Sequence, residues 1–328
     1  MPYNNSDAIP RTDISTALME AMGQEGLYIA PQLMPVYDSE TENGRYPKFT
    51  RDDTALLKAS GDYGGAAATL RAPNGTYNES ESNFIWDNFQ TSEYGEERRI
   101  DDALRIRYRN FFDYDMIESK ILMNRMMTAY EIQTAAILNN SSTFTATAAS
   151  VAYTEANIAT IDFPKDATDC IERLTLIGEQ VNLTAVMSLS LWNRIKRTTK
   201  MNTYLFGPLN TNAGGSNITT EAVAAALGLS QIIIAKKAVD TGVKGKAATM
   251  SSVWGNSYIW IGSIGQGEFS NGGVGRTIVF SADSPGGLFT SEQYRNEAAR
   301  GDKIRVRSNR VLKVCNASAA QLITTSFA

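Results

Sequence analysis

The longest periodic pattern of apolar residues in the chain covers residues 113–140 and predicts one long α-helix. Side chains recur there at steps of three and four residues, which places them on one face of a helix. This predicted inner face comprises Met116, Lys120, Met123, Met127, Tyr130, Thr134 and Ile137, widened by Ile117, Ile121 and Leu138. A helix of this length extends about 34 Å or more, so it is expected to be the scaffold of the fold.

The ends and the outer side of this helix are also predicted. Asp115, with Glu118 three residues later, matches a capping box at the start, and Asn139 with Asn140 matches a stop signal. The polar positions predict a solvated or subunit-facing side formed by Glu118, Lys120, Asn124, Arg125, Glu131 and Gln133.

The chain before the helix is much less hydrophobic. Residues 1–41 are expected to form an arm that is extended except for a short helix at 13–22, capped by Asp13 and ended by Gly23. In residues 45–51, RYPKFTR, basic and aromatic side chains alternate, which predicts an edge strand in which Pro47 limits pairing. Residues 68–71 are expected to run back as the second arm of a long hairpin. Because this hairpin cannot sustain a core alone, it needs a covering surface.

The chain after the helix alternates between helical and strand patterns. Residues 141–160 predict a surface linker, and the strict alternation of residues 104–109, LRIRYR, predicts a half-buried strand. Helices are expected at 167–177, 191–197 (capped by Ser190) and 220–227. Strands at 183–189, 231–235, 258–261 and 277–280 are expected to share one sheet. Strands at 303–307, 310–314 and 319–324 are expected to pack on the long helix.

Composition excludes several classes of function. The 328 residues are 43% hydrophobic and 20% charged, as in a globular protein of two or three domains. The chain has no histidine, which removes the commonest general base and metal ligand. The net charge of −4 argues against a dedicated nucleic-acid-binding protein. Neither a secretory signal nor a membrane span is expected, and the two cysteines, Cys170 and Cys315, fit a reducing compartment.

None of the motifs that could carry chemistry has the required spacing. The glycines at 262, 265 and 267 and at 272, 273 and 275 match neither a dinucleotide-binding fingerprint nor a phosphate-binding loop. The pairs Asp52-Asp53 and Asp101-Asp102 are interpreted as solvated charge, and the arginines at 98, 99, 105, 107 and 109 as salt-bridged surface. Trp192, Trp254 and Trp260 are expected in the core. The sequence therefore predicts no catalytic, cofactor-binding or metal-binding residue.

Ordered weak motifs over residues 90–325 resemble the major capsid proteins of tailed bacteriophages. The first group is DFP at 162–164, Gly178, NLTAVMS at 182–188 and LWNRIK at 191–196. The second is ALGL at 226–229, IIIAKKA at 232–238 and VWGN at 253–256. The third is GRT at 275–277, EQY at 292–294 and DKIRVR at 302–307.

The resemblance implies an α+β chain with the HK97-like capsid fold. Residues 1–41 would be the N-terminal arm and residues 42–95 the extended loop, or E-loop. Residues 96–165 and 290–328 would form the peripheral domain with the spine helix at 113–140, and residues 166–289 the axial domain. In such a shell the hairpin and the arm would be covered by neighbouring subunits.

The implied function is structural: a major capsid protein that self-assembles into the icosahedral head around double-stranded DNA. Its implied partners are its own copies in hexamers and pentamers, scaffolding, portal and decoration proteins, and weakly the packaged DNA, without a membrane or a cofactor. The implied location is the virion capsid, assembled in the host bacterial cytoplasm. The candidate assembly contacts are Arg45, Tyr46, Lys48, Phe49, Arg51, Lys58 and Arg71. Some members of the family crosslink a loop lysine to a neighbour's asparagine, and Lys58 lies well inside this loop.

Two alternatives remain open at this point. An encapsulin-type compartment that encloses enzyme cargo would share the fold. A soluble, histidine-free α/β enzyme would instead have a defined pocket within residues 166–289 and would form a stable monomer or small oligomer.

Overall fold

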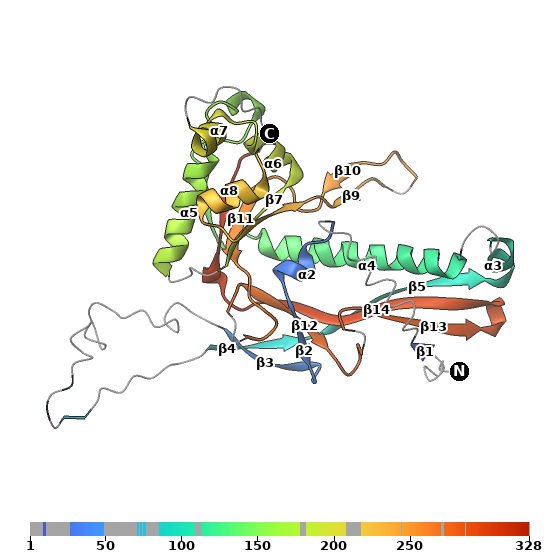
Figure 1. Ribbon diagram of the computed structural model, residues 1–328. Coiled ribbons are helices and arrows are strands. Elements are labelled where there is room, and N and C mark those ends of the chain that lie inside the picture. The colour runs from blue at the N-terminus through green and yellow to red at the C-terminus, as the bar shows by residue number, and fades with distance from the viewer. Residues whose placement is uncertain are drawn as a thin grey trace.

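The computed structural model describes residues 9–10, 27–48, 71, 73, 75–76, 85–108, 113–177, 182–207, 218–243, 245–269, 272–285 and 287–327. These residues form two sheets with helices packed on them (Figure 1). A long helix, α4 (Tyr114–Leu138), lies along the first sheet, and a group of shorter helices lies beside the second.

The first sheet has six strands built around one long central strand, β14 (Gly301–Val314). Antiparallel to β14 lie β13 (Thr290–Asn296), β12 (Gly275–Phe280) and β5 (Ser92–Asp101). The edges are β1 (Ile9–Pro10), which pairs with β13, and β2 (Val36–Ser39), which runs parallel to β12. Two sequence predictions were wrong here. The strands expected at 303–307 and 310–314 are one strand, and the strand at 277–280 belongs to this sheet rather than to the sheet of residues 183–189.

Helix α4 is the predicted long helix and covers nearly the predicted range, but its N-cap residue and its inner face differ from the prediction. The N-cap is Asp113, whose side chain accepts the N–H of Met116 at 3.2 Å. The inner face buries Leu122, Met123, Met126, Met127 and Tyr130 against the sheet, whereas Ile117 and Ile121 are exposed. Apolar residues occur on both sides of this helix, so periodicity alone did not identify the side that packs.

Glu131 was expected on the polar side of α4, but it is completely buried. Its carboxylate accepts the N–H groups of Ile29 at 3.1 Å and Ala30 at 2.9 Å, and the indole N–H of Trp254 at 2.6 Å. Burial raises the pKa of Glu131, and these hydrogen bonds oppose the rise. A buried carboxylate with three donors joins segments that are distant in sequence, because each donor would otherwise be unsatisfied.

The chain from Leu27 onward is therefore part of the subunit core rather than a free arm. The short helix α2 (Ala30–Leu33) follows the two N–H groups that Glu131 binds. Ile29, Leu33 and Met34 are buried in a cluster that also contains the end of α4. The short helix predicted at 13–22 lies outside the described residues.

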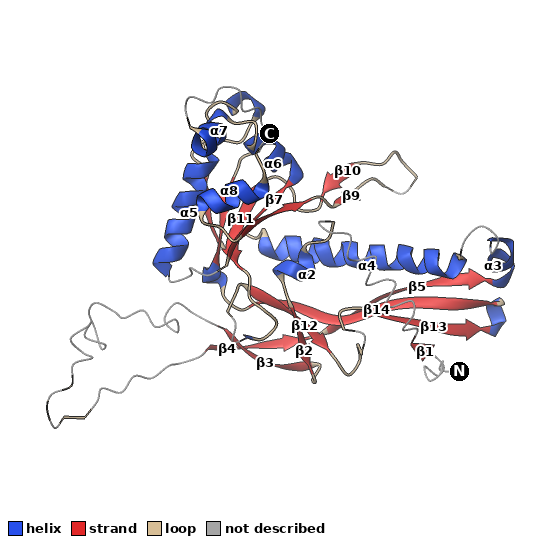
Figure 2. Cartoon of the chain, in the orientation of Figure 1, coloured by secondary structure: helices blue, strands red, loops and turns tan. Residues whose placement is uncertain are grey.

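The second sheet has the order β6 (Thr145–Ala148), β15 (Ala320–Thr324), β11 (Tyr258–Ser263), β7 (Leu183–Ser188) and β8 (Gln231–Ala235). Its helices are α5 (Phe163–Ile177), α6 (Leu189–Ile195), α7 (Thr199–Phe206) and α8 (Thr220–Leu227). Figure 2 shows these helices gathered beside the second sheet, away from α4. The elements expected at 167–177, 183–189, 220–227, 231–235 and 258–261 are confirmed, but α6 is capped by Ser188 rather than Ser190.

The two faces of the second sheet pack against different partners. Alternate residues of β7 point to opposite faces: Ala185 and Met187 pack with the helices, and Val186 packs with the end of α4. Trp260 and Trp254 lie in this second cluster, and Trp192 lies in the first, so the prediction that all three are in the core is confirmed. The cluster around Val186 thereby joins the two sheets.

Three further segments differ from their predictions. Residues 104–109 were expected to form a strand, but residues 102–108 form the helix α3 (Asp102–Tyr108). The expected linker at 141–160 contains β6, and its residues Phe144 and Tyr153 are buried. The C-terminal strand β15 pairs with β11 and β6 rather than joining the strands on α4. These pairings are long-range, so local alternation did not reveal them. The 3-10 helices are Glu155–Asn157, Glu297–Ala299 and Ala317–Ala319.

The glycine-rich stretch at 262–275 closes around an arginine. The guanidinium of Arg276 is buried and donates to the carbonyl oxygens of Gly267 at 3.0 Å, Glu268 at 2.8 Å and Gly275 at 2.9 Å, and also to that of Gly272. A Cβ on Gly265 would lie 2.1 Å from the Gly272 oxygen, so this loop requires glycine. The loop therefore encloses a side chain of its own subunit.

Two hairpins extend from the two sheets (Figure 1). One pairs β9 (Ala238–Asp240) with β10 (Met250–Ser252). The other pairs β3 (Asn43–Lys48) with β4 (Ile85–Gln90), so that Lys48 lies opposite Ile85. The partner of residues 45–48 is thus β4, not the segment 68–71 predicted from sequence, of which residues 68–70 lie outside the described residues.

Candidate assembly surface

The β3–β4 hairpin is attached to the subunit through one of its two faces. Tyr46 and Phe89 are buried there with Ile278 and Cys315. The Tyr46 hydroxyl donates to Asp87 at 3.1 Å, and burial together with the Asp87 carboxylate raises the pKa of Tyr46 well above its ordinary value. A Cβ on Gly44 would lie 2.9 Å from the Phe89 ring, so glycine permits this close packing. The hairpin is therefore held at a defined angle to the first sheet.

The opposite face of the hairpin points away from the subunit, because side chains alternate along each strand. Arg45 and Pro47 lie on it in β3, and Trp86 lies opposite Pro47 in β4. The Trp86 side chain is 59% exposed. Its neighbour Ile85, on the other face opposite Lys48, is 52% exposed. A large aromatic side chain with this much open surface is typical of a residue that a binding partner covers.

A shallow hollow lies beside this face. It is lined by Asn43, Gly44, Arg45, Asn88, Phe89, Gln90 and Lys313. The lining has two cations and three amide side chains, and none of these residues is acidic. Amide and cationic groups that donate hydrogen bonds come together here without a carboxylate. Such a hollow suits an acidic side chain of a partner.

The structure separates the predicted contact residues into different groups. Arg45 is on the outer face, and Lys48 forms an exposed ion pair with Asp87 at 3.5 Å, which contributes little to stability. Tyr46 is buried in its own subunit, where it anchors the hairpin, and its role as an assembly contact stays a prediction. Arg71 is exposed and its Nε donates to the Gly75 oxygen at 2.6 Å. Phe49, Arg51 and Lys58 lie outside the described residues.

Ile85 and Trp86 were missed by the sequence analysis. Their signal was present: two large apolar residues stand next to each other in a stretch that otherwise has few aliphatic side chains. Nothing in the local sequence showed whether Trp86 faces the core, because the partner strand was misassigned.

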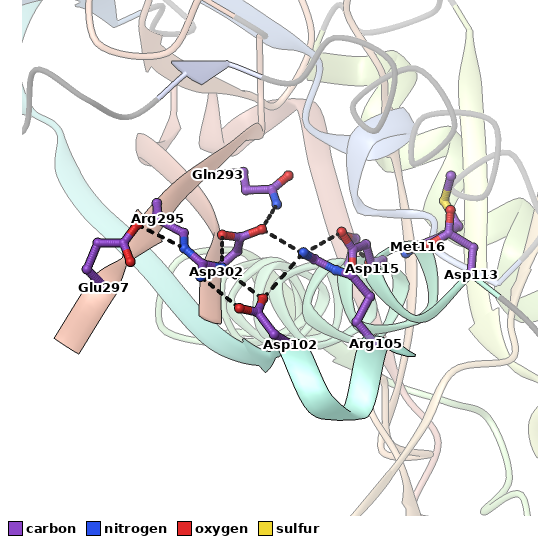
Figure 3. Close-up of polar contacts among 10 residues, drawn as sticks. Asp102, Arg105, Asp113, Asp115, Met116, Gln293, Arg295, Glu297 and Asp302 are labelled. Atoms are coloured by element: carbon purple, nitrogen blue, oxygen red, sulfur yellow. Dashed lines mark hydrogen bonds and ion pairs between the residues drawn. The ribbon is translucent and has the colours of Figure 1, made fainter. Parts of the chain in front are cut away.

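At the other end of the first sheet, charged residues form ion pairs within the subunit (Figure 3). Arg105 of α3 contacts Asp115 at 2.9 Å and Asp302 at 2.7 Å, and Arg295 contacts Asp102 at 2.7 Å. Burial tends to raise the pKa of Asp302, but hydrogen bonds from the two arginines outweigh it and lower the pKa. These contacts tie α3, α4, β13 and β14 together.

The ion pairs show what the nearby arginine and aspartate residues of the sequence do in the fold. Arg98 pairs with Glu118, and Arg99 with Asp101 at 3.4 Å, so the prediction of a salt-bridged surface is confirmed for Arg98, Arg99 and Arg105. The carboxylates of Asp101 and Asp102 pair with arginines and not with each other. Asp52 and Asp53 lie outside the described residues.

The described part of the chain has few features of other kinds of site. Within it, no group of three or more Cys, Asp or Glu side chains is arranged to hold a metal ion. Burial raises the pKa of the thiols of Cys170 and Cys315 to about 11, which disfavours the reactive thiolate. Among the same residues, no helix is both long and apolar enough to cross a membrane.

Comparison with solved structures identifies the fold. A phage-related protein from Bordetella bronchiseptica RB50 superposes with a TM-score of 0.68 at 16% identity, covering 97% of this chain and 98% of that one. The capsid of the cyanophage P-SCSP1u gives a TM-score of 0.57 at 10% identity, covering 92% of this chain and 89% of that one. The chain has the HK97-like capsid fold. By the resemblance described above, α4 is predicted to be the spine helix and the β3–β4 hairpin the base of the extended loop.

Two further comparisons complete this result. A virus-like particle from Pyrococcus furiosus gives a TM-score of 0.54 at 9% identity, covering 95% of this chain and 98% of that one. No protein-family model matches the sequence, and no curated protein matches it. The fold class predicted from the weak sequence motifs, α+β with the HK97-like arrangement, is confirmed. The residue ranges given for the arm, loop and domains stay predictions.

Proposed function

We propose that this protein is the major capsid protein of a tailed phage, and that it self-assembles into the icosahedral head that encloses double-stranded DNA. The observation that carries the proposal is the outer face of the β3–β4 hairpin, on which the Trp86 side chain is 59% exposed beside Arg45 and Pro47. The HK97-like fold supports it, because the solved structures of similar fold include phage capsids.

The outer face of the hairpin leaves a large aromatic side chain open, Trp86. Trp86 and Arg45 are residue types that dominate binding energy when a partner covers them. The hollow beside them carries Arg45 and Lys313, which favours an acidic side chain from the adjoining copy. Each such contact is weak alone, but a closed lattice repeats it in every subunit and so multiplies its effect.

The proposal includes partners and location. Copies of the chain would form hexamers and pentamers, with scaffolding, portal and decoration proteins as further partners and weak contact with the packaged DNA. Assembly would take place in the host bacterial cytoplasm, and the product would be the virion capsid. No catalytic role is part of the proposal.

The test combines negative-stain electron microscopy with light scattering on purified wild-type protein and on Trp86→Ala. Wild-type protein should form closed shells or megadalton particles. Trp86→Ala should lose about 2 kcal/mol or more per contact, which raises the concentration needed for assembly about 30-fold. Its thermal unfolding as a subunit should not change.

The matched control is Leu176→Ala, which truncates a side chain on α5 that is 76% exposed and distant from the hairpin. It should assemble like wild type. Normal shells from Trp86→Ala would show that this face is not the assembly contact. Shells that contain DNA would support a phage head, whereas shells with protein cargo would favour the compartment alternative. A protein that stays small under every assembly condition would favour the enzyme alternative.

A further inference from the structure

The side chain of Arg310 is enclosed between α4 and the first sheet, where the helix lies along β5 and β14 (Figure 1). Arg310 belongs to β14 and is completely buried. Its guanidinium carbon faces three aromatic rings, 4.8 Å from the centre of the Tyr94 ring, 4.9 Å from that of Tyr130 and 5.3 Å from that of Phe289. These rings come from β5, from α4 and from the residue before β13. A cation is therefore held at the point where these elements meet.

The hydrogen bonds of this guanidinium are incomplete. Its Nη2 donates to the side-chain oxygen of Gln133 at 3.2 Å, but its Nε and Nη1 have no acceptor among the described residues. The hydroxyl of Ser308, on the same face of β14, is also buried and has no partner in that part of the chain. Ser308 pairs with Tyr94 in the register of the sheet, so it shares an aromatic wall with the guanidinium. Because buried polar groups are nearly always satisfied, these donors indicate an acceptor from outside the subunit.

The charge of Arg310 lacks a counterion as well. Arg305 and Arg307, on the opposite face of β14, both pair with Glu292, whereas no carboxylate of the described residues pairs with Arg310. Burial lowers the pKa of Arg310 to about 10, so the group is still charged at neutral pH. Aromatic rings attract a cation but carry no net charge, and a buried charge without a counterion is costly. A water molecule would accept hydrogen bonds and leave this charge uncompensated, whereas an anion does both.

The surroundings of the guanidinium limit the kind of anion that fits. Tyr130 is completely buried and Phe289 nearly so, whereas Tyr94 is 38% exposed. Tyr94 therefore forms the wall that faces solvent, and a small free anion needs only a movement of its ring to enter. A carboxylate from a partner would have to bring its own main chain between α4 and β5. Aromatic walls also penalise an ion that keeps its hydration water, which favours a weakly hydrated monovalent anion.

We propose that the guanidinium of Arg310 binds a halide ion, chloride in ordinary solution, between α4 and the first sheet. The ion accepts hydrogen bonds from the open N–H groups of Arg310, and the Ser308 hydroxyl is a further donor. Gln133 and Tyr130 belong to α4, whereas Arg310 and Ser308 belong to β14, so the bound ion stabilises the packing of the helix on the sheet. The site lies within one subunit and does not depend on the proposed assembly function.

The first experiment is thermal unfolding of dilute, unassembled full-length protein at constant ionic strength, with sodium chloride replacing sodium gluconate stepwise. Gluconate is too large to pass Tyr94. The melting temperature should rise by about 2 °C for each tenfold increase in chloride above the dissociation constant. Arg310→Met replaces the buried cation by an apolar side chain, so it should fold and lose the chloride dependence. The matched control is Lys246→Met, which removes an exposed cation between β9 and β10 and should keep the dependence.

The second experiment locates the ion directly in crystals of the wild-type protein grown in sodium bromide. An anomalous scattering peak in contact with the Arg310 guanidinium is the expected result. Because this measurement needs no variant, it decides the proposal even if Arg310→Met fails to fold. Density for water alone, without anomalous signal, would overturn the proposal, and so would equal chloride dependence in wild type and Arg310→Met. A bromide peak with a melting temperature that is independent of chloride would mean an adventitious ion only, and would overturn it too.

Discussion

The spine helix and the β3–β4 hairpin use apolar residues in opposite ways. In α4, Leu122, Met127 and Tyr130 are buried completely or nearly so by the sheet of their own subunit. In the hairpin, Tyr46 and Phe89 are buried, but Trp86 and Ile85 are left open. The proposed function therefore assigns stability of the subunit and association between subunits to separate residues, which can be changed independently.

The physical reason for the difference is position in the fold. Helix α4 lies along the first sheet, so an entire side of it meets β14 and β5 (Figure 1). The hairpin extends from the edge of the subunit, so only the face that carries Tyr46 and Phe89 meets the core. When only one face of a strand pair is packed, the alternate side chains on the other face are available to a partner.

The largest effect should come from Met127→Asp, which places an unpaired charge under α4. We expect a loss of about 4 kcal/mol or more, or no soluble folded protein, because a buried charge without a partner is strongly destabilising. Circular dichroism and thermal unfolding measure it. Met250→Asp is the matched control, since Met250 is 64% exposed on β10 and should tolerate the charge. An unchanged melting temperature in Met127→Asp would mean that the inner face of α4 has been misidentified.

A smaller but pH-dependent effect should come from Glu292→Gln in β13. The Glu292 carboxylate accepts hydrogen bonds from Arg305 and from Arg307 at 2.8 Å. Burial tends to raise the pKa of Glu292, but the two arginines outweigh it and lower the pKa below its ordinary value of 4.5. At pH 7 the variant should lose about 3 kcal/mol, as when one partner of a buried pair is removed.

The sign of the pH dependence follows from the lowered pKa. The folded protein holds Glu292 ionised more firmly than the unfolded chain does, so this stabilisation is present above pH 4.5 and decreases as the pH falls below it. The difference in unfolding free energy between wild type and Glu292→Gln should therefore shrink on acidification, as measured by denaturant unfolding at several pH values. Glu172→Gln, at an exposed position of α5, should change little. A difference independent of pH would contradict the assigned role of Glu292.

The smallest effect should come from Tyr46→Phe, which removes the hydroxyl that donates to Asp87. The ring packing remains, so we expect a loss of about 1 kcal/mol in the stability of the hairpin base. Hydrogen exchange of the amides of β3 and β4 should increase, while exchange in α4 should not. Equal changes in both regions would show that the hairpin and the spine helix unfold as one unit rather than separately.

Local sequence patterns predicted most elements but not how they combine. The periodicity of residues 113–140 predicted α4, and the apolar runs predicted β7, β8 and β11, because these signals depend on neighbours in sequence. The alternation at residues 104–109 misled: the segment is helical, and Arg105 pairs with Asp115 and Asp302 rather than lying on a strand. Ion pairs to distant residues are not encoded in a local period.

Local sequence patterns located only part of the candidate site, again because they do not show contacts between distant residues. Its location on a hairpin at residues 45–48 followed from composition, and Arg45 is on the outer face. Tyr46 was assigned to the surface although Phe269 and Phe89 cover it. Trp86 could not be recognised without its pairing to Pro47, since that register decides which face it occupies.

The sequence by itself determined the spine helix, most strands of the second sheet and the absence of histidine chemistry, because these depend on composition and short periods. Only the tertiary structure decided which side of α4 is inward, which sheet receives β12 and β15, and why Glu131 can be buried. It also decided that Trp86 is left open. Each of these depends on contacts between residues far apart in the chain, and burial is a property of those contacts rather than of the residue alone.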